Sequence, residues 1–165
     1  MFQASSKVLA LPQLLEAVAR RRKNGERMVF TNGCFDLLHW GHVRYLEAAR
    51  NEADFLVVGL NSDSSVEGLK GTTRPLFSQK HRAELLAGLA CVDYVTVFCE
   101  PTAQELVATL RPEVYVKGGD YKDPHSLPEA QVVLAAGGEI KLLPGAQEIS
   151  TSRIMEAIVN GEGRL

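Results

Sequence analysis

The chain has 165 residues, of which 45% are hydrophobic and 23% are charged, and its formal net charge is −2. This length predicts a single domain, and the slightly acidic balance argues against a general nucleic-acid binder. No apolar run approaches the roughly 20 residues of a membrane span, and the first residues lack the order of a signal peptide. The three cysteines, Cys34, Cys91 and Cys99, cannot all pair within one chain and form no CxxC pattern, which favours a reducing, cytoplasmic setting.

Short apolar segments alternate with helical patterns along the chain. In chain order, the patterns predict a helix at 12–23, a strand at 28–32, a helix at 41–52, a strand at 54–61, a helix capped by Ser78, a strand at 93–98, a helix at 101–110, a strand at 113–118, a helix at 128–136, a weaker strand at 139–144 and a helix at 151–159. This alternation predicts the α/β class, as a Rossmann-like, doubly wound, parallel sheet of five strands. We expect residues 1–26 to add an N-terminal helix to a domain that spans 27–165.

Ligands of such a sheet bind outside the carboxyl ends of its strands, where the strand order reverses. After the first strand, two histidines three residues apart, His39 and His42, flank Gly41 at the predicted start of a helix. Free N–H groups at a helix N-terminus favour an anion, and the helix dipole favours neutral imidazoles unless a polyphosphate lies nearby. An ordinary pair of core or surface histidines is the weaker alternative. A zinc site is disfavoured because no third ligand has suitable spacing, and the segment is neither GxxxxGK[ST] nor GxGxxG.

A second candidate phosphate site lies at the start of the last predicted helix. Ser150 caps this helix, while Ile149 and Ile154 take the positions of a hydrophobic staple. Arg153 lies in the first turn, where a cation opposes the helix dipole unless an anion lies beside it. Hydroxyl side chains and an arginine at one helix start are compatible with phosphate binding. Taken alone they favour an ordinary capped surface helix, and the histidine pair after the first strand shifts the interpretation to phosphate binding.

Further cations follow the other strands. Lys70 and Arg74 lie in the Gly- and Thr-rich stretch 68–75, which we expect to be a mobile loop. These two side chains either bind substrate phosphates or are solvated loop charges. Lys117 stands at the carboxyl end of the fourth strand, where packing gives little reason for a cation, so phosphate binding is favoured. Arg82 is a weaker candidate.

Two of these segments resemble a known family. Residues 33–42, GCFDLLHWGH, resemble the HxGH signature of the nucleotidyltransferases that include cytidylyltransferases and pantetheine-phosphate adenylyltransferase. Residues 149–154, ISTSRI, resemble the C-terminal ISTSxI element of the same family. The resemblance implies that both histidines contact a nucleoside triphosphate and stabilise the charge that builds up as pyrophosphate leaves.

Five further segments resemble the adenylyltransferase half of the bifunctional ADP-heptose synthesis enzymes; they are 30–36, 61–63, 69–71, 73–75 and 116–121. That resemblance implies the transfer of AMP from ATP to D-glycero-D-manno-heptose 1-phosphate, giving ADP-heptose and pyrophosphate. The single-domain length then favours the stand-alone adenylyltransferase over the fusion with a kinase. One alternative is a glycerol-3-phosphate cytidylyltransferase, which shares the FDLLHWGH string but carries an Arg-Thr-Glu-Gly stretch that is absent before Ile149 here. The other alternative is a non-catalytic nucleotide sensor on the same fold.

Each candidate residue thus has an expected role. The expected catalytic groups are His39, His42, Lys117 and Arg153. The expected nucleotide- and phosphate-binding residues are Thr31, Asn32, Gly33, Cys34, Phe35, Gly41, Asn61, Ser150, Thr151 and Ser152. Candidates for the acceptor's phosphate are Lys70, Arg74, Arg82, Gly118, Gly119 and Asp120. We expect Mg²⁺ to bridge the phosphates of ATP, with Asp36 either supporting the metal or orienting a loop. The family implies a homodimer, and neither a nucleic acid nor a membrane is an expected partner.

Overall fold

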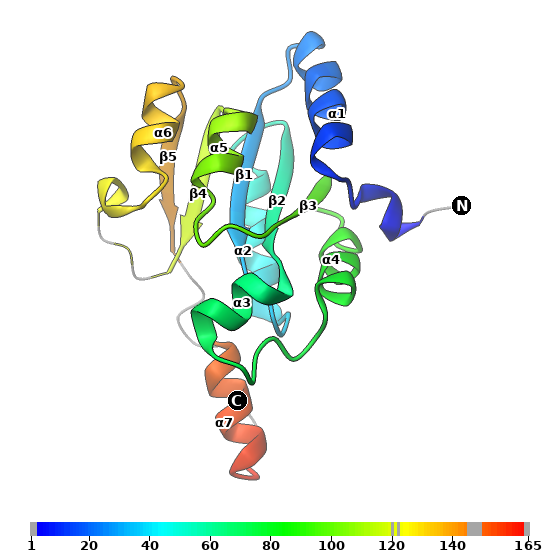
Figure 1. Ribbon diagram of the computed structural model, residues 1–165, viewed down its shortest axis with the longest axis vertical. Coiled ribbons are helices and arrows are strands. Elements are labelled where there is room, and N and C mark those ends of the chain that lie inside the picture. Colours follow the sequence, from blue (N-terminus) through cyan, green and yellow to red (C-terminus); the bar gives the residue numbers. More distant parts are fainter. Residues whose placement is uncertain (1–2, 120, 122, 145–149, 164–165) are drawn as a thin grey trace.

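Five parallel strands form one sheet in the order β3-β2-β1-β4-β5 in the computed structural model, which describes residues 3–119, 121, 123–144 and 150–163 (Figure 1). The strands are β1 (Met28–Gly33), β2 (Phe55–Asn61), β3 (Tyr94–Phe98), β4 (Val114–Gly118) and β5 (Glu139–Leu143). The predicted five-stranded parallel sheet is therefore confirmed, including its weakest strand. The strand order reverses between β1 and β4, because the chain builds outward from β1 to β3 and then returns to the other side of β1.

Helices connect the strands close to the predicted positions. They are α1 (Leu11–Lys23), α2 (Trp40–Arg50), α3 (Asp63–Lys70), α4 (Gln79–Ala87), α5 (Gln104–Leu110), α6 (Ala130–Ala135) and α7 (Thr151–Val159), with short 3-10 turns at Ala4–Lys7 and Pro124–Ser126. Two expectations were wrong. Part of the stretch expected to be a mobile loop belongs to α3, whose N-terminus is capped by the Ser62 hydroxyl, an acceptor for the Ser65 N–H at 3.1 Å. Helix α5 begins at Gln104 rather than at Pro101.

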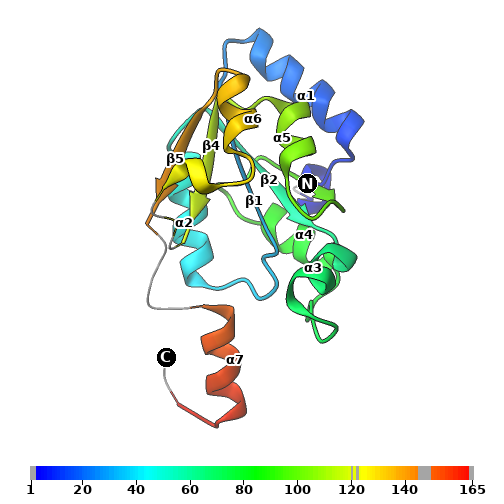
Figure 2. The same ribbon diagram turned by 60° about the vertical axis from the view of Figure 1, so that its left-hand side comes forward.

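The helices cover both faces of the sheet, which explains why the strands are continuously apolar. Helices α1, α5 and α6 pack on one face, and α2 and α4 pack on the other (Figures 1 and 2). Successive residues of β1 point to opposite faces, so Met28 and Phe30 join the first core while Val29 joins the second. Because both faces of these parallel strands are buried, their sequences do not alternate between apolar and polar residues.

The N-terminal helix belongs to this core. Leu14 and Val18 of α1 are buried in the same cluster as Phe30 and Leu110. Before α1, Val8 forms a parallel bridge with Val95, and the Leu9 N–H donates to the Val95 carbonyl at 2.9 Å. The segment thus covers the β3 edge of the sheet, a position that would otherwise expose unpaired backbone groups.

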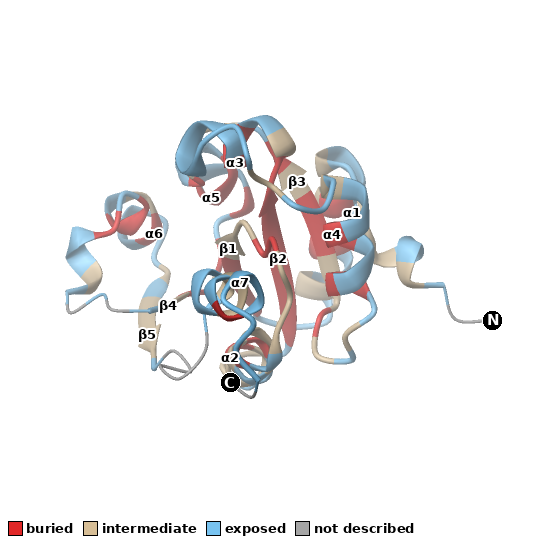
Figure 3. Ribbon diagram, turned by 90° about the horizontal axis from the view of Figure 1, so that it is seen from below, coloured by how far each residue is buried: buried red, intermediate tan, exposed pale blue. Residues whose placement is uncertain are grey.

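Helix α7 lies beyond the carboxyl edge of the sheet, next to the start of α2. Figure 3 looks onto this edge and shows α7 in front of β1 and α2. No helix in the described part of the chain has both the length and the apolar character needed to cross a membrane. The fold therefore brings the segments after β1 and β4 and the start of α7 to one edge.

Candidate active site

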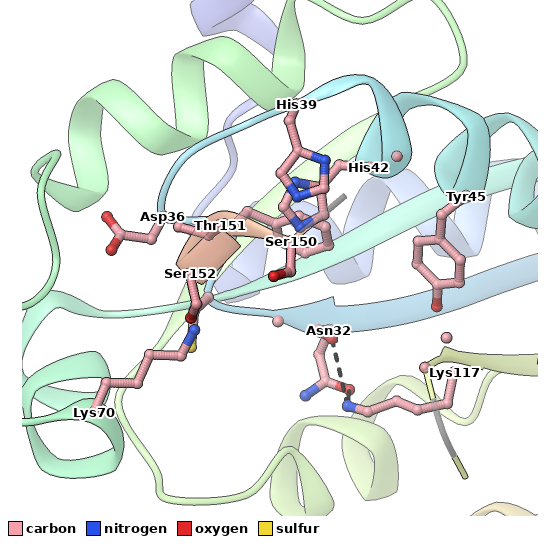
Figure 4. Close-up of a pocket in the computed structure, with 16 residues that line it drawn as sticks. Asn32, Asp36, His39, His42, Tyr45, Lys70, Lys117, Ser150, Thr151 and Ser152 are labelled. Carbon is pink, nitrogen blue, oxygen red and sulfur yellow. Dashed lines mark hydrogen bonds between the residues drawn. The ribbon is translucent and has the colours of Figure 1, made fainter. Parts of the chain in front are cut away.

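A cavity of about 380 Å³ opens at the carboxyl ends of β1 and β4, where the strand order reverses (Figure 4). Its described lining comes from the segment after β1, the first turns of α2, the end of α3, the end of β4 and the start of α7. The lining residues are Asn32, Gly33, Cys34, Phe35, Asp36, His39, Gly41, His42, Tyr45, Lys70, Lys117, Gly118, Gly119, Ser150, Thr151 and Ser152. The structure thus brings together most of the residues that the sequence singled out.

The turn between β1 and α2 holds Phe35 in an uncommon backbone conformation. Its φ of 43° is in the left-handed region, which is unfavourable for a bulky residue and is kept only where packing compensates. The Phe35 ring is buried and meets the His42 ring edge-on, with 5.3 Å between the ring centroids. A Cβ atom at Gly33 would lie 3.1 Å from Phe35 Cε2, so the glycine gives this ring its space.

The two histidines lie in the first turn of α2. His39 is the N-cap residue, and the His42 N–H donates to the His39 carbonyl at 2.9 Å. Their rings stack with centroids 3.9 Å apart and an interplanar angle of 28°. Both Nδ1 atoms are buried and have no hydrogen-bond partner among the described residues. The two Nδ1 atoms thus have no partner of good geometry here, although the Leu37 backbone lies near enough to His42 to favour its protonated form.

Both imidazoles favour the neutral form. Burial, followed by the charges of His39 and Lys70, lowers the pKa of His42 to about 4, and burial also lowers the pKa of His39. Neutral rings are what the N-terminal end of the helix dipole favours. A polyphosphate beside the rings would reverse this preference, because an adjacent anion stabilises the protonated form.

On the opposite wall, Lys117 reaches back to β1. Its Nζ donates to Asn32 Oδ1 at 2.9 Å and to the Asn32 carbonyl at 3.4 Å (Figure 4). Burial lowers the pKa of Lys117, while the charges of Glu129 and Cys34 act in the opposite direction. A buried ammonium with one protein acceptor residue retains donor capacity for an anion.

Tyr45 is a lining residue that sequence reasoning missed. It lies three residues after His42, so both side chains are on the same face of α2, and this spacing is the signal that could have found it. Its hydroxyl lies 2.7 Å from Thr31 Oγ1 and donates to the Val116 carbonyl at 3.2 Å, and burial raises its pKa to about 12. Thr31, expected to contact the nucleotide, is buried and bonded to Tyr45 instead of lining the cavity.

The start of α7 lies beside the two histidines (Figure 4). As predicted, Ser150 caps the helix, with its hydroxyl accepting from the Arg153 N–H at 3.2 Å. Thr151 Oγ1 donates to the Leu37 carbonyl at 3.3 Å and so ties α7 to the HxGH segment. Arg153, however, pairs with Glu162 at 2.5 Å and is not among the lining residues. The predicted staple residue Ile149 lies outside the described residues, as does Asp120.

Asp36 and Arg74 bind each other rather than a free ligand. Arg74 Nη1 donates to Asp36 Oδ2 at 2.6 Å, and Asp36 Oδ1 accepts from the Leu76 N–H at 2.6 Å. The Asp36 side chain is almost fully buried, so this ion pair fastens the segment after α3 to the turn after β1. Of the two roles expected for Asp36, its described contacts are those of a loop-orienting residue.

Two further candidates have structural partners. The Arg82 side chain is fully buried and donates to the Cys34 carbonyl at 2.6 Å, to the Phe77 carbonyl at 2.9 Å and to Asp63 at 2.8 Å. Asn61 donates to Ser65 Oγ at 2.9 Å. Neither lines the cavity, so the expected contacts of Arg82 and Asn61 with phosphate have no support in this arrangement.

The charge of the cavity suits a polyphosphate. Lys70 and Lys117 supply two ammonium groups, whereas Asp36 is the one described carboxylate of the lining and is neutralised by Arg74. The amino end of α2 adds its positive dipole end. Among the described residues, no group of three His, Cys, Asp or Glu side chains could hold a metal ion.

Comparisons with known proteins agree with this geometry. The family model described as "Cytidylyltransferase-like" matches residues 30–157. The bifunctional protein HldE of Citrifermentans bemidjiense is 48% identical over 95% of this chain, and that of Pseudomonas aeruginosa is 50% identical over 92%. HldE of Geobacter sulfurreducens matches 98% of the chain at 48% identity, a span that necessarily includes most of residues 1–26. The chain spans only about a third of the length of these curated relatives, 32%, 32% and 33% in turn.

Two solved structures share the fold. The lipopolysaccharide core biosynthesis protein from Thermoplasma volcanium aligns with a TM-score of 0.59 and 28% identity, covering 74% of this chain and 98% of that one. A pantoate-beta-alanine ligase from Francisella tularensis aligns with a TM-score of 0.60 over 91% of this chain and 76% of that one, and its 13% identity indicates a common fold only. Because the family model spans most of the chain and relatives near 48% identity cover almost all of it, the chain belongs to the cytidylyltransferase-like family.

Proposed function

We propose that this chain is an adenylyltransferase that transfers AMP from ATP to a sugar 1-phosphate and releases pyrophosphate. The observation that carries the proposal is the cavity itself. It sets two stacked histidines, whose Nδ1 atoms have no hydrogen-bond partner among the described residues, at the start of α2 opposite the half-buried ammonium of Lys117. The hydroxyls of the α7 start lie beside the histidines. Such a set of donors matches a ligand that develops negative charge on phosphate oxygens.

The proposed reaction is a direct displacement. An oxygen of the acceptor's phosphate forms a bond to the α-phosphorus of ATP, and the bond between that phosphorus and the bridging oxygen breaks to release pyrophosphate. The attacking phosphate is already ionised near neutral pH, so no general base is required. Catalysis then depends on positioning and on stabilising charge. His39, His42 and Lys117 would donate to the oxygens on which this charge accumulates.

Mg²⁺ is part of the proposal as a companion of ATP. Bound to the nucleotide's phosphates, it would neutralise charge on them, and it needs few protein ligands because it retains several waters. Asp36 is already engaged by Arg74 and Leu76. We therefore assign no residue of the described chain to the metal.

For the acceptor we propose D-glycero-D-manno-heptose 1-phosphate. Five segments resemble the adenylyltransferase half of the bifunctional ADP-heptose synthesis enzymes, and matches that cover about a third of bifunctional relatives support such a half. We place the enzyme in the cytoplasm, which supplies ATP and where its three free cysteines would stay reduced. A homodimer remains the expectation for its assembly.

Two alternatives remain to be tested against this proposal. A glycerol-3-phosphate cytidylyltransferase would share the HxGH segment, and the stretch that would distinguish it, before α7, includes residues 145–149 outside the described chain. A non-catalytic nucleotide sensor would bind ATP and give no product. It would have no need of donors that act only as pyrophosphate leaves, yet His39, His42 and Lys117 are all present.

A panel of pyrophosphate-release assays separates the three. It crosses ATP, CTP and GTP with heptose 1-phosphate and glycerol 3-phosphate, and we expect release with ATP and heptose 1-phosphate. Replacing His39 or His42 by Ala should lower turnover at least ~10²-fold, while His81→Ala, a change at an exposed histidine of α4, should not. Release only with CTP and glycerol 3-phosphate would favour the cytidylyltransferase, and nucleotide binding without product would favour the sensor.

A further inference from the structure

The side-chain oxygen of Asn32 accepts two hydrogen bonds. Tyr115 Oη donates to it at 2.8 Å, and Lys117 Nζ donates to it at 2.9 Å. An amide oxygen has two lone pairs, so these two donors use its capacity. Both come from alternate residues of β4, which point to the same side of the sheet.

The Lys117 ammonium determines which way the Asn32 amide points, and the Tyr115 hydroxyl supports that orientation by donating to the same oxygen. If the amide were turned over, its NH₂ group would face the Lys117 ammonium, which has donors and no acceptor. That arrangement would set two donors against each other at a half-buried position, which is costly. The NH₂ group therefore points to the other side, and Figure 4 shows the Asn32 nitrogen turned away from Lys117. No described residue accepts a hydrogen bond from it, although Asn32 lines the cavity.

Tyr115 is well suited to hold this amide still. Its side chain is fully buried, and its ring stacks on Phe30 with 6.1 Å between centroids and an interplanar angle of 20°. Phe30 is its register partner on β1, two residues before Asn32. The hydroxyl is thus carried on a rigid ring in the core, so its position relative to Asn32 does not depend on a mobile loop.

We propose that Tyr115 is a positioning residue for ligand binding, which acts by orienting the Asn32 amide. The Asn32 NH₂ group and the Lys117 ammonium then form a pair of donors for one phosphate oxygen, either of ATP or of the acceptor. This inference rests on the proposed function only in taking the ligands to be phosphates. Tyr115 itself does not line the cavity, so its hydroxyl affects the ligand through Asn32, while the contact of its ring with Lys117 Nζ, 6.0 Å from the ring centroid, is kept in Tyr115→Phe.

A double-mutant cycle tests the proposal. The variants are Tyr115→Phe, Asn32→Ala and the double variant, with Tyr94→Phe as the matched control, because Tyr94 lies at the amino end of β3, far from the cavity edge. Calorimetry measures the affinities for ATP and for heptose 1-phosphate separately, which distinguishes the two sources of the phosphate. We expect Tyr115→Phe to weaken one of them about 3- to 10-fold and Asn32→Ala to weaken it about 10-fold or more. The double variant should match Asn32→Ala, since Tyr115 acts through the missing amide.

Asn32→Asp separates ligand binding from a structural role. A carboxylate still accepts from Tyr115 and Lys117, but it has no NH₂ group and repels phosphate. We expect Asn32→Asp to bind the ligand more weakly than Asn32→Ala does. If Asn32 had a purely structural role, Asn32→Asp would instead lose less affinity than Asn32→Ala. Thermal unfolding would verify that each variant is folded.

Two results would overturn the proposal. The first is that the fold-losses of affinity in Tyr115→Phe and Asn32→Ala multiply in the double variant. The second is that folded variants bind both ligands with unchanged affinity. Affinity is measured without turnover, so the cycle can hold even if the wild-type protein releases no pyrophosphate. In that case the proposed function fails and this inference stands. A wild-type protein that binds neither ligand would refute both.

Discussion

The neutral state of His42 has a consequence for stability that can be measured. Its pKa falls from 6.5 to about 4 on folding, because of burial and then of the charges of His39 and Lys70. The unfolded chain therefore binds a proton more readily than the folded chain between these two pH values. Stability is unaffected above pH 6.5 and is lost as the pH falls from there towards 4.

The size of the effect follows from the same numbers. The full difference corresponds to at most about 3 kcal/mol in the free energy of unfolding, of which about 2 kcal/mol is lost by pH 5. Solvent screens a ring that is only partly buried, so about 1 kcal/mol is the expected loss between pH 7 and pH 5. Urea unfolding followed by circular dichroism at both pH values measures it.

Replacing His42 by glutamine, which does not titrate, isolates this contribution from the other groups that change charge. We expect His42→Gln to lose about 1 kcal/mol less than the wild type between pH 7 and pH 5. The control His81→Gln removes an exposed histidine and should lose as much as the wild type. Equal losses in the wild type and in His42→Gln would refute the reasoning, because His42 would then titrate alike in both states.

Two further predictions concern Gly118 in the wall of the cavity and Arg153 outside it. A Cβ atom at Gly118 would lie 2.7 Å from Tyr45 Cε2. Gly118→Ala should therefore displace the Tyr45 ring and lower the free energy of unfolding by about 1–3 kcal/mol. In the control Gly68→Ala the new Cβ would have no atom within 4 Å, so the protein should not be destabilised. Urea unfolding measures the stability of both variants. If Gly118→Ala is as stable as the wild type, the Tyr45 ring can move aside without cost and the prediction is wrong. Arg153 pairs with Glu162 outside the cavity, so Arg153→Ala should change pyrophosphate release less than about fivefold. A loss near ~10²-fold would instead support the catalytic role expected from sequence.

Local patterns predicted the fold because each element carries its own signal. The strands are short apolar runs that need burial on both faces, and this need by itself implies helices on each side of a parallel sheet. Helix α3 escaped notice because Gly68 weakens its helical pattern, although Ser62 is in place as a cap. Helix α5 begins later than Pro101 predicts, and the N–H of its N-cap residue Ala103 donates to Glu129 Oε1 at 3.0 Å, a partner that lies 26 residues away.

The basic residues of the site show where local patterns stop being sufficient. Lys70 and Lys117 reach the cavity, while Arg74 and Arg82 bind partners 38 and 48 residues away in sequence, Asp36 and Cys34. A guanidinium group pairs with whatever acceptor the fold brings near, and no spacing in the chain reveals that acceptor. Tyr115 is a similar case, because its contact with Asn32 exists only where β4 lies beside β1.

The sequence by itself determined the five strands, every helix but α3, the position of the histidine pair after the first strand and the Ser150 cap, because these depend on neighbours within a few residues. Only the tertiary structure decided which cations face the ligand and how the Asn32 amide points. Those outcomes depend on side chains from strands and loops that meet across the sheet, and hydrogen-bond partners are set by distance in space rather than along the chain.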